Sequence, residues 1–150
     1  MRILAVSDRV LDKLYSGQTR RMFPDIDLII GCGDLPFYYL DFLTSALDAP
    51  LVFVRGNHDG IEQYAADGSV WRGVRGGVDI HGKIVTHKGL ILAGMQGSMR
   101  YKSRSDYMYS ESEMRMVVAQ MVPRLLWNRQ RFGRALDILV THSPPFGIHD

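Results

Sequence analysis

The stretch LVFVRGNHDG, residues 51–60, decides how the rest of the sequence is interpreted. An almost continuous apolar run leads directly into a crowded polar group, residues 56–59. A solvated turn is the simplest explanation, because Gly and Asn tolerate left-handed backbone and Asp binds nearby backbone amides. That explanation would suffice for a single occurrence, but a similar pattern recurs elsewhere in the chain.

The other apolar runs also end in polar residues. They are ILAVSD, ending at Asp8, DLIIGCGD, ending at Asp34, and DILVTHSPP, which contains His142. Short, nearly continuous apolar runs bounded by turn residues are typical of strands buried on both faces, as in a parallel sheet. Between the second and third runs, residues 35–50 have Pro36 where a helix can begin and apolar side chains at helical spacing. These segments predict a βαβ unit in an α/β fold.

The polar residues that follow these strands are expected to meet. Carboxyl ends of parallel strands lie along one edge of a sheet, and open α/β sheets bind ligands at that edge. The sequence therefore predicts one cluster of polar side chains rather than four separate turns; its members are Asp8, Asp34, Asn57, His58 and His142.

The second half of the chain predicts a mixed sheet and a long helical region. Residues 79–98 have the pattern of a meander, with glycine-containing turns at residues 82–83 and 88–89. Ser110 and Glu113 form a capping-box pattern, so a helix is expected to begin near residue 111. Pro123 is expected to break or kink that helix, with a second helical piece running to Gly133.

Residues 97–109, GSMRYKSRSDYMY, have neither strand nor helix periodicity. Long loops of this kind often carry function, and this one could form a lid that offers Arg100, Tyr101 or Lys102 to an anionic substrate. A surface loop without a role explains the same pattern equally well. The sequence leaves both interpretations open.

Composition narrows the class of protein. The 150 residues are 46% hydrophobic and 23% charged, which is ordinary for a single globular domain. A net charge of +2 with both signs interspersed gives no electrostatic case for nucleic acid as a partner. No apolar run approaches the length of a membrane span, and the single cysteine, Cys32, fits a reducing compartment. We therefore predict a cytoplasmic protein.

The predicted cluster has the chemistry of a divalent-cation site. Carboxylates, an amide oxygen and an imidazole suit Mn²⁺, Fe²⁺, Zn²⁺ or Mg²⁺. Two such ions about 3.5 to 4 Å apart can stabilise both oxygens of an in-line phosphoryl displacement, and His58 could then protonate the leaving alkoxide. Each residue alone is more simply a cap, a turn or a buried histidine. Four coincidences at equivalent strand ends are less plausible than one site.

The ordered motifs SD (7–8), GD (33–34), GNHD (56–59) and THSPP (141–145) resemble those of the calcineurin-like metallophosphoesterases, especially the prokaryotic cytoplasmic-type members. The resemblance implies a four-layer α-β-β-α sandwich with mixed sheets and two divalent ions. It also implies a metal-bound hydroxide attacking a phosphomonoester or phosphodiester substrate. The roles it assigns are Asp8 on the first ion, Asp34 bridging both, Asn57 and His142 on the second, and His58 as the acid.

Two features depart from the family pattern. Val10 stands where a histidine ligand is common, and no Gly-His-x-His segment follows His142 in these residues, although His149 could replace one missing ligand or lie at the surface. His81 and His87 are expected to be structural. We therefore expect a domain that lacks its last strands, whose exposed sheet edges favour a homodimer. The alternative function is a catalytically silent metal-binding or scaffolding domain.

Overall fold

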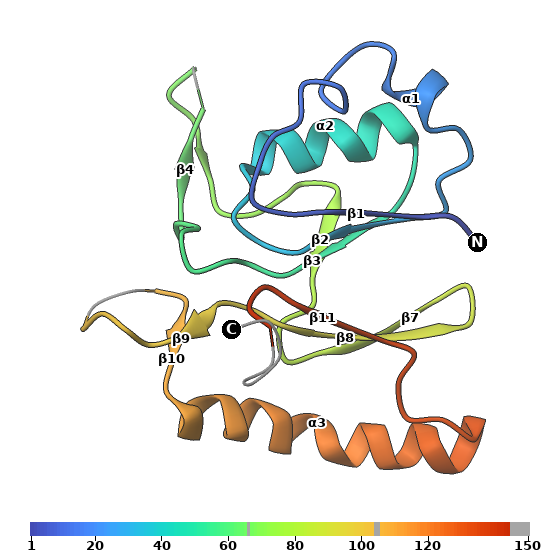
Figure 1. The fold of residues 1–150 in the computed structure, drawn as a ribbon, viewed down its shortest axis with the longest axis vertical. Helices are drawn as coiled ribbons and strands as arrows, with labels where there is room; N and C mark the ends of the chain where they lie inside the picture. The colour runs from blue at the N-terminus through green and yellow to red at the C-terminus, as the bar shows by residue number, and fades with distance from the viewer. Residues whose placement is uncertain (66, 104–105, 145–150) are drawn as a thin grey trace.

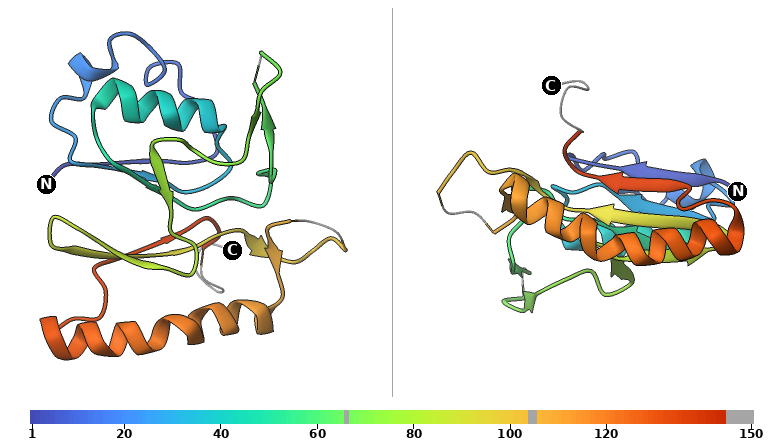
Figure 2. Two further views of the ribbon diagram at one scale, coloured as in Figure 1. Left: turned by 180° about the vertical axis from the view of Figure 1, so that it is seen from behind. Right: turned by 90° about the horizontal axis from the view of Figure 1, so that it is seen from below.

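The computed structural model describes residues 1–65, 67–103 and 106–144. Two β-sheets face each other, with one helix layer on the outer face of each sheet (Figure 1). Helix α2 (Phe37–Leu47) lies against the first sheet, together with the short helix α1 (Thr19–Met22), and helix α3 (Glu111–Phe132) lies across the second. The left view of Figure 2 shows the same stacking from behind, and the right view looks from below with α3 nearest the viewer. The predicted four-layer α-β-β-α arrangement is therefore confirmed.

The first sheet is wholly parallel among the described residues. Its strands have the order β1-β2-β3-β6, namely β1 (Ile3–Val6), β2 (Leu28–Gly31), β3 (Leu51–Phe53) and β6 (Gly77–Asp79). Every residue of β2 is buried. Its side chains alternate, because Ile29 packs with the helix layer while Leu28 and Ile30 enter the core between the sheets. This two-sided burial explains why the strand is apolar at consecutive positions.

Helix α2 completes the predicted βαβ unit. Pro36 takes the N-cap position with extended backbone, and apolar side chains at helical spacing are buried against the first sheet: Phe37, Leu40, Leu43 and Leu47. The helix ends at Asp48, which has left-handed backbone (φ 52°). Pro50 then leads directly into β3. This helix returns the chain to the starting edge of the sheet, so β2 and β3 run parallel.

The second sheet is mixed and has the order β11-β8-β7. Strands β7 (Ile84–His87) and β8 (Leu90–Met95) form an antiparallel hairpin, whereas β11 (Ile138–Thr141) pairs with β8 in parallel. The predicted meander over residues 79–98 is only partly correct. Its second turn, at residues 88–89, is present, but β6 joins the first sheet beside β3. The turn at residues 82–83 therefore carries the chain from one sheet to the other.

Two short strand pairs lie outside the main sheets. Strands β4 (Gln63–Tyr64) and β5 (Val70–Trp71) pair antiparallel, and β9 (Ser98–Met99) pairs with β10 (Met108–Tyr109) in parallel. The second pair closes the 97–109 segment, which the sequence had left without assigned structure.

Helix α3 begins as predicted but does not divide. The Ser110–Glu113 capping box is present, and the helix runs through Pro123 without interruption to Phe132. The prediction of two helical pieces is therefore wrong. Pro123 is exposed, so water can solvate the carbonyl that loses its intrahelical partner. Over the described residues, no helix is both long and apolar enough to cross a bilayer.

The core between the two sheets fixes the position of the sheet edge at which the predicted polar cluster lies. It consists of buried side chains from both sheets and from the crossover between them: Leu28, Ile30, Val52, Val54, Ile80, Leu92 and Val140. Because this core fixes the distance between the sheets, residues at the end of β11 can face residues that follow β2 and β3.

We predict that Leu92→Ala destabilises the protein by about 2–5 kcal/mol, because Leu92 is fully buried in this core and its removal leaves a cavity. Urea unfolding followed by circular dichroism measures the change. Leu126→Ala is the matched control, since Leu126 is 61% exposed on α3 and its loss should cost less than about 0.5 kcal/mol. Equal destabilisation by both variants would contradict this description of the core.

Candidate metal centre

Residues that follow four strands meet at one edge of the two sheets. Asp8 follows β1, Asp34 follows β2, the 56–59 loop follows β3, and His142 follows β11. One ligand atom each from Asp8, Asp34 and His142 lies within 4.8 Å of the other two. Asn57 joins them through its side-chain oxygen, 3.1 Å from Nε2 of His142. The structure thus brings together the four residues that the sequence singled out as metal ligands.

Close backbone approach makes this convergence possible. Gly33 has φ 95°, and both Asp8 (φ 63°) and Asp34 (φ 56°) adopt left-handed backbone, which is uncommon for residues other than glycine. A Cβ added to Gly56 would lie 2.0 Å from Oδ1 of Asp34. The glycine preceding Asn57 is therefore required because the Asp34 carboxylate occupies the space that a side chain would need.

Asp59 ties the same two loops together. One oxygen of its carboxylate accepts the backbone N–H of Asp34 at 3.0 Å and that of Gly56 at 2.7 Å. In return, Oδ1 of Asp34 accepts the backbone N–H of His58 at 2.9 Å. Burial raises the pKa of Asp59, although the two N–H groups oppose this shift. The predicted site omitted Asp59, and its place at the end of the GNHD motif was the available signal.

The hydrogen bonds of His142 determine which of its ring nitrogens faces the cluster. Nδ1 lies 2.9 Å from the backbone oxygen of Cys32, so Nδ1 carries the proton and donates it to that carbonyl. Nε2 is then the ring nitrogen that faces Oδ1 of Asn57 and Oδ2 of Asp34, the latter 3.4 Å away. Three electron-rich atoms that face one another require a cation or a proton between them. This donor set fits a divalent cation.

Fewer candidate ligands are available for a first metal position, beside Asp8. Asp8 is exposed and accepts a hydrogen bond from the hydroxyl of Ser7. Val10, which stands where the family commonly has a histidine, packs against the core between the first sheet and α2. Over the described residues, a first metal position would therefore rely on Asp8 and Asp34, with solvent completing its coordination. His149 lies outside the described residues.

His58 lies at the rim of the cluster rather than within it. Its side chain lines an open pocket together with Asp8, Asp34 and Asp59. Its backbone holds Asp34, whereas its ring is not among the groups that converge on a common point. This placement suits a residue that exchanges protons with a bound substrate better than it suits a ligand.

The three predicted anion-binding residues of the 97–109 segment differ in position. The Tyr101 hydroxyl accepts the side-chain N–H of Asn57 at 3.2 Å, so Tyr101 reaches the site. Lys102 lies over the Tyr101 ring, 5.3 Å from its centroid. The guanidinium of Arg100 binds both carboxylate oxygens of Glu113, at 2.8 and 3.0 Å. Arg100 is therefore directed toward the start of α3 and not toward the cluster.

The two histidines expected to be structural do have structural contacts. Nδ1 of His81 accepts the backbone N–H of Gln96, and its ring stacks on Tyr109. Burial lowers the pKa of His81, which favours the neutral ring that this contact requires. His87 contacts the backbone oxygen of Asp27.

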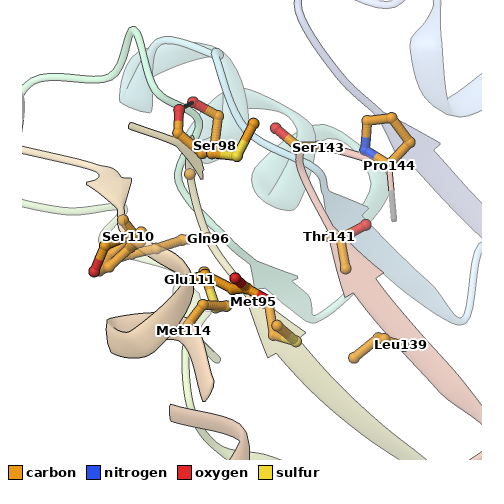
Figure 3. Close-up of a pocket in the computed structure, with 13 residues that line it drawn as sticks. Met95, Gln96, Ser98, Ser110, Glu111, Met114, Leu139, Thr141, Ser143 and Pro144 are labelled. Carbon is orange, nitrogen blue, oxygen red and sulfur yellow. Dashed lines mark hydrogen bonds between the residues drawn. The ribbon is translucent and has the colours of Figure 1, made fainter. Parts of the chain in front are cut away.

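A second pocket lies on the face of the second sheet that points away from the core between the sheets (Figure 3). Leu139 and Thr141 of β11 line it, together with Met95 of β8 and Met114 of α3. Side chains alternate along a strand, so these residues face away from the core that contains Val140. Among the described residues that line it, no set of metal ligands is present, and the cluster around Asp34 is the better candidate for chemistry.

Comparison with protein families identifies the class of protein. The calcineurin-like phosphoesterase family matches residues 1–150, and the chain belongs to this family. Members act on phosphate esters, and a cluster of acidic and histidine side chains suited to divalent metal is present here. A search of curated proteins found no match.

We predict that Gly56→Ala weakens Mn²⁺ binding at least about tenfold, because the added methyl group displaces the Asp34 carboxylate. Isothermal titration calorimetry measures the affinity. Gly17→Ala is the matched control, since a Cβ there meets no atom within 4 Å. Unchanged affinity in Gly56→Ala would show that Asp34 is not a ligand.

Proposed function

We propose that this domain hydrolyses phosphomonoester or phosphodiester bonds with two divalent ions, each Mn²⁺, Fe²⁺, Zn²⁺ or Mg²⁺. Family membership already makes it a metal-dependent phosphoesterase in general. The observation that carries the finer proposal is the arrangement around His142, whose Nε2 faces oxygens of Asn57 and Asp34 at 3.1 and 3.4 Å. Such an arrangement of acceptors is suited to a cation.

Four side chains would hold the ions. The Asp34 carboxylate lies 3.4 Å from Nε2 of His142 and offers a ligand atom within 4.8 Å of one from Asp8, which supports a bridging role. The Asp34 and His142 side chains are only 13% and 9% exposed. Limited solvent access strengthens the interaction of these groups with a cation. When bound, the ions would activate water and stabilise charge on the phosphoryl oxygens.

The remaining residues would act on the substrate directly. His58 would donate its ring proton to the oxygen of the leaving group, since it lines the open pocket beside Asp34 without joining the ligands. The oxygen of Tyr101 accepts from Asn57, and its hydroxyl would donate its own proton to a phosphoryl oxygen. Arg100 was the second substrate-binding candidate, and to take that role it would have to leave Glu113.

A catalytically silent domain is the second candidate function. The burial of Val10 against the core favours it, because a valine there supplies no ligand to the first ion. A domain that binds one ion through Asp34, Asn57 and His142 would retain the fold without hydrolysing esters.

A cytoplasmic location is also part of the proposal; the single cysteine supports it.

Two substitutions separate metal binding from catalysis. Asn57→Ala should weaken Mn²⁺ binding and phosphatase activity together, because it removes a ligand. His58→Ala should lower turnover by about 10²–10⁴-fold while Mn²⁺ affinity is retained, because it removes a general acid. Hydrolysis of an aryl phosphate and of an aryl phosphodiester with added Mn²⁺ gives the activity, and calorimetry gives the affinity.

His87→Ala is the matched control, since His87 contacts the backbone oxygen of Asp27, a residue that precedes β2. Activity that is indifferent to Mn²⁺ and to Asn57 would rule out the mechanism. Mn²⁺ binding without any hydrolysis would favour the silent domain. Equal loss of metal and activity in His58→Ala would place His58 among the ligands.

We further propose a homodimer formed through an open sheet edge. Among the described residues β11 pairs only with β8, and its Leu139 side chain is 48% exposed. Unpaired apolar edge strands favour association. Light scattering should therefore detect a dimer, and Leu139→Lys should shift it toward monomer because a charge on an edge opposes pairing. A strictly monomeric wild-type protein would contradict the proposal.

A further inference from the structure

Arg55, directly before the 56–59 loop, lies partly buried where several segments meet. Its side chain is only 11% exposed and lies near the rings of Phe37 and Tyr107, 5.1 and 5.2 Å from their centroids. The guanidinium donates to the backbone oxygens of Gly60 and Arg72, at 3.1 and 2.7 Å. A planar guanidinium can satisfy several fixed acceptors at once, which a lysine ammonium cannot do in the same geometry.

The same residue also binds the 97–109 segment. Nη1 of Arg55 donates to the hydroxyl of Tyr107 at 2.8 Å, and the backbone oxygen of Arg55 accepts the N–H of Gly97 at 2.7 Å. The backbone oxygen of Tyr107 in turn accepts the N–H of Ser98 at 3.1 Å. Gly97 and Tyr107, near the two ends of the segment, are thus both bound to Arg55. Strands β9 and β10, which adjoin these two residues, pair with each other.

The described residues beyond β9 lead back to the metal centre. Tyr101 is 60% exposed, yet its hydroxyl accepts the side-chain N–H of Asn57 at 3.2 Å. The segment therefore contacts the 56–59 loop region twice, at Arg55 and two residues later at Asn57. An exposed side chain can hold a ligand in place only when the backbone that carries it is itself anchored.

Resting on the proposed metal site, we propose that Arg55 is a positioning residue for the metal centre. By binding Tyr107 and Gly97, it fixes the described residues at the two ends of the 97–109 segment so that Tyr101 holds the side chain of Asn57 beside His142. Groups that orient metal ligands from outside commonly change metal affinity about 10- to 100-fold when they are removed. Tyr107, whose hydroxyl is far along the chain from the ligands, then influences affinity through Tyr101.

A double-mutant cycle on two hydroxyl groups tests this coupling. Tyr101→Phe should weaken Mn²⁺ binding about tenfold, and Tyr107→Phe should weaken it in the same direction, because each removes one hydrogen bond and keeps the ring. The double variant should bind Mn²⁺ no more weakly than Tyr101→Phe alone, since Tyr107 acts through Tyr101. Titration calorimetry of the full 150-residue chain with Mn²⁺ gives the affinities.

Tyr64→Phe is the matched control, because Tyr64 is a 76% exposed tyrosine on β4. Its affinity and melting temperature should equal those of the wild type. Arg55→Lys should reproduce the loss seen in Tyr107→Phe. If it does not fold, the two tyrosine variants still decide the question, because each leaves the buried guanidinium in place.

The outcomes separate this inference from the function on which it rests. A wild-type chain that binds none of Mn²⁺, Fe²⁺, Zn²⁺ and Mg²⁺ would overturn both. Normal wild-type binding with unchanged affinity in Tyr107→Phe would overturn the coupling alone. Fully additive losses in the double variant would also overturn it, because they would mean that the two tyrosines act independently.

Discussion

The contact between the Asp34 carboxylate and the backbone of Gly56 is the constraint on which the rest of the site depends. A Cβ at Gly56 would overlap Oδ1 of Asp34, so the loops after β2 and β3 can touch only because residue 56 has no side chain. Asp59 then binds the backbone N–H groups of both loops and fixes their separation. Asp34 itself has left-handed backbone (φ 56°), which is uncommon for residues other than glycine.

The second sheet supplies the histidine of the candidate metal site. His142 follows β11, and it reaches the first sheet because apolar side chains between the two sheets hold them face to face. Its Nδ1–H donates a hydrogen bond to the Cys32 carbonyl next to Gly33. The imidazole therefore presents Nε2 to the oxygens of Asn57 and Asp34. Packing in the core thus determines the chemistry at the edge, because it sets which atoms of distant strands face one another.

Predictions from the sequence were correct where a local pattern of residues sets the structure. They failed where residues distant in the sequence, or exposure to solvent, set the outcome. Apolar runs gave the parallel strands, and Pro36 with its helical spacing gave α2. A break or a kink was expected at Pro123, and the helix does not break there, because an exposed face lets water satisfy the freed carbonyl. Arg100 was a reasonable anion-binding candidate, but Glu113 at the start of α3 takes its guanidinium. Neither outcome is visible without knowing what surrounds the residue.

By itself the sequence determined an α/β fold with a βαβ unit, the strand ends that carry polar groups, and the residue types that suit a divalent cation. These follow from burial and strand direction, which leave a periodic record in the chain. The four layers were implied only by the resemblance to a family. Only the tertiary structure decided that β6 joins the first sheet, that Asp59 and Arg55 support the loops, and that Tyr101 rather than Arg100 reaches Asn57. Such contacts join residues far apart in sequence, and their geometry depends on distances that only the packed core sets.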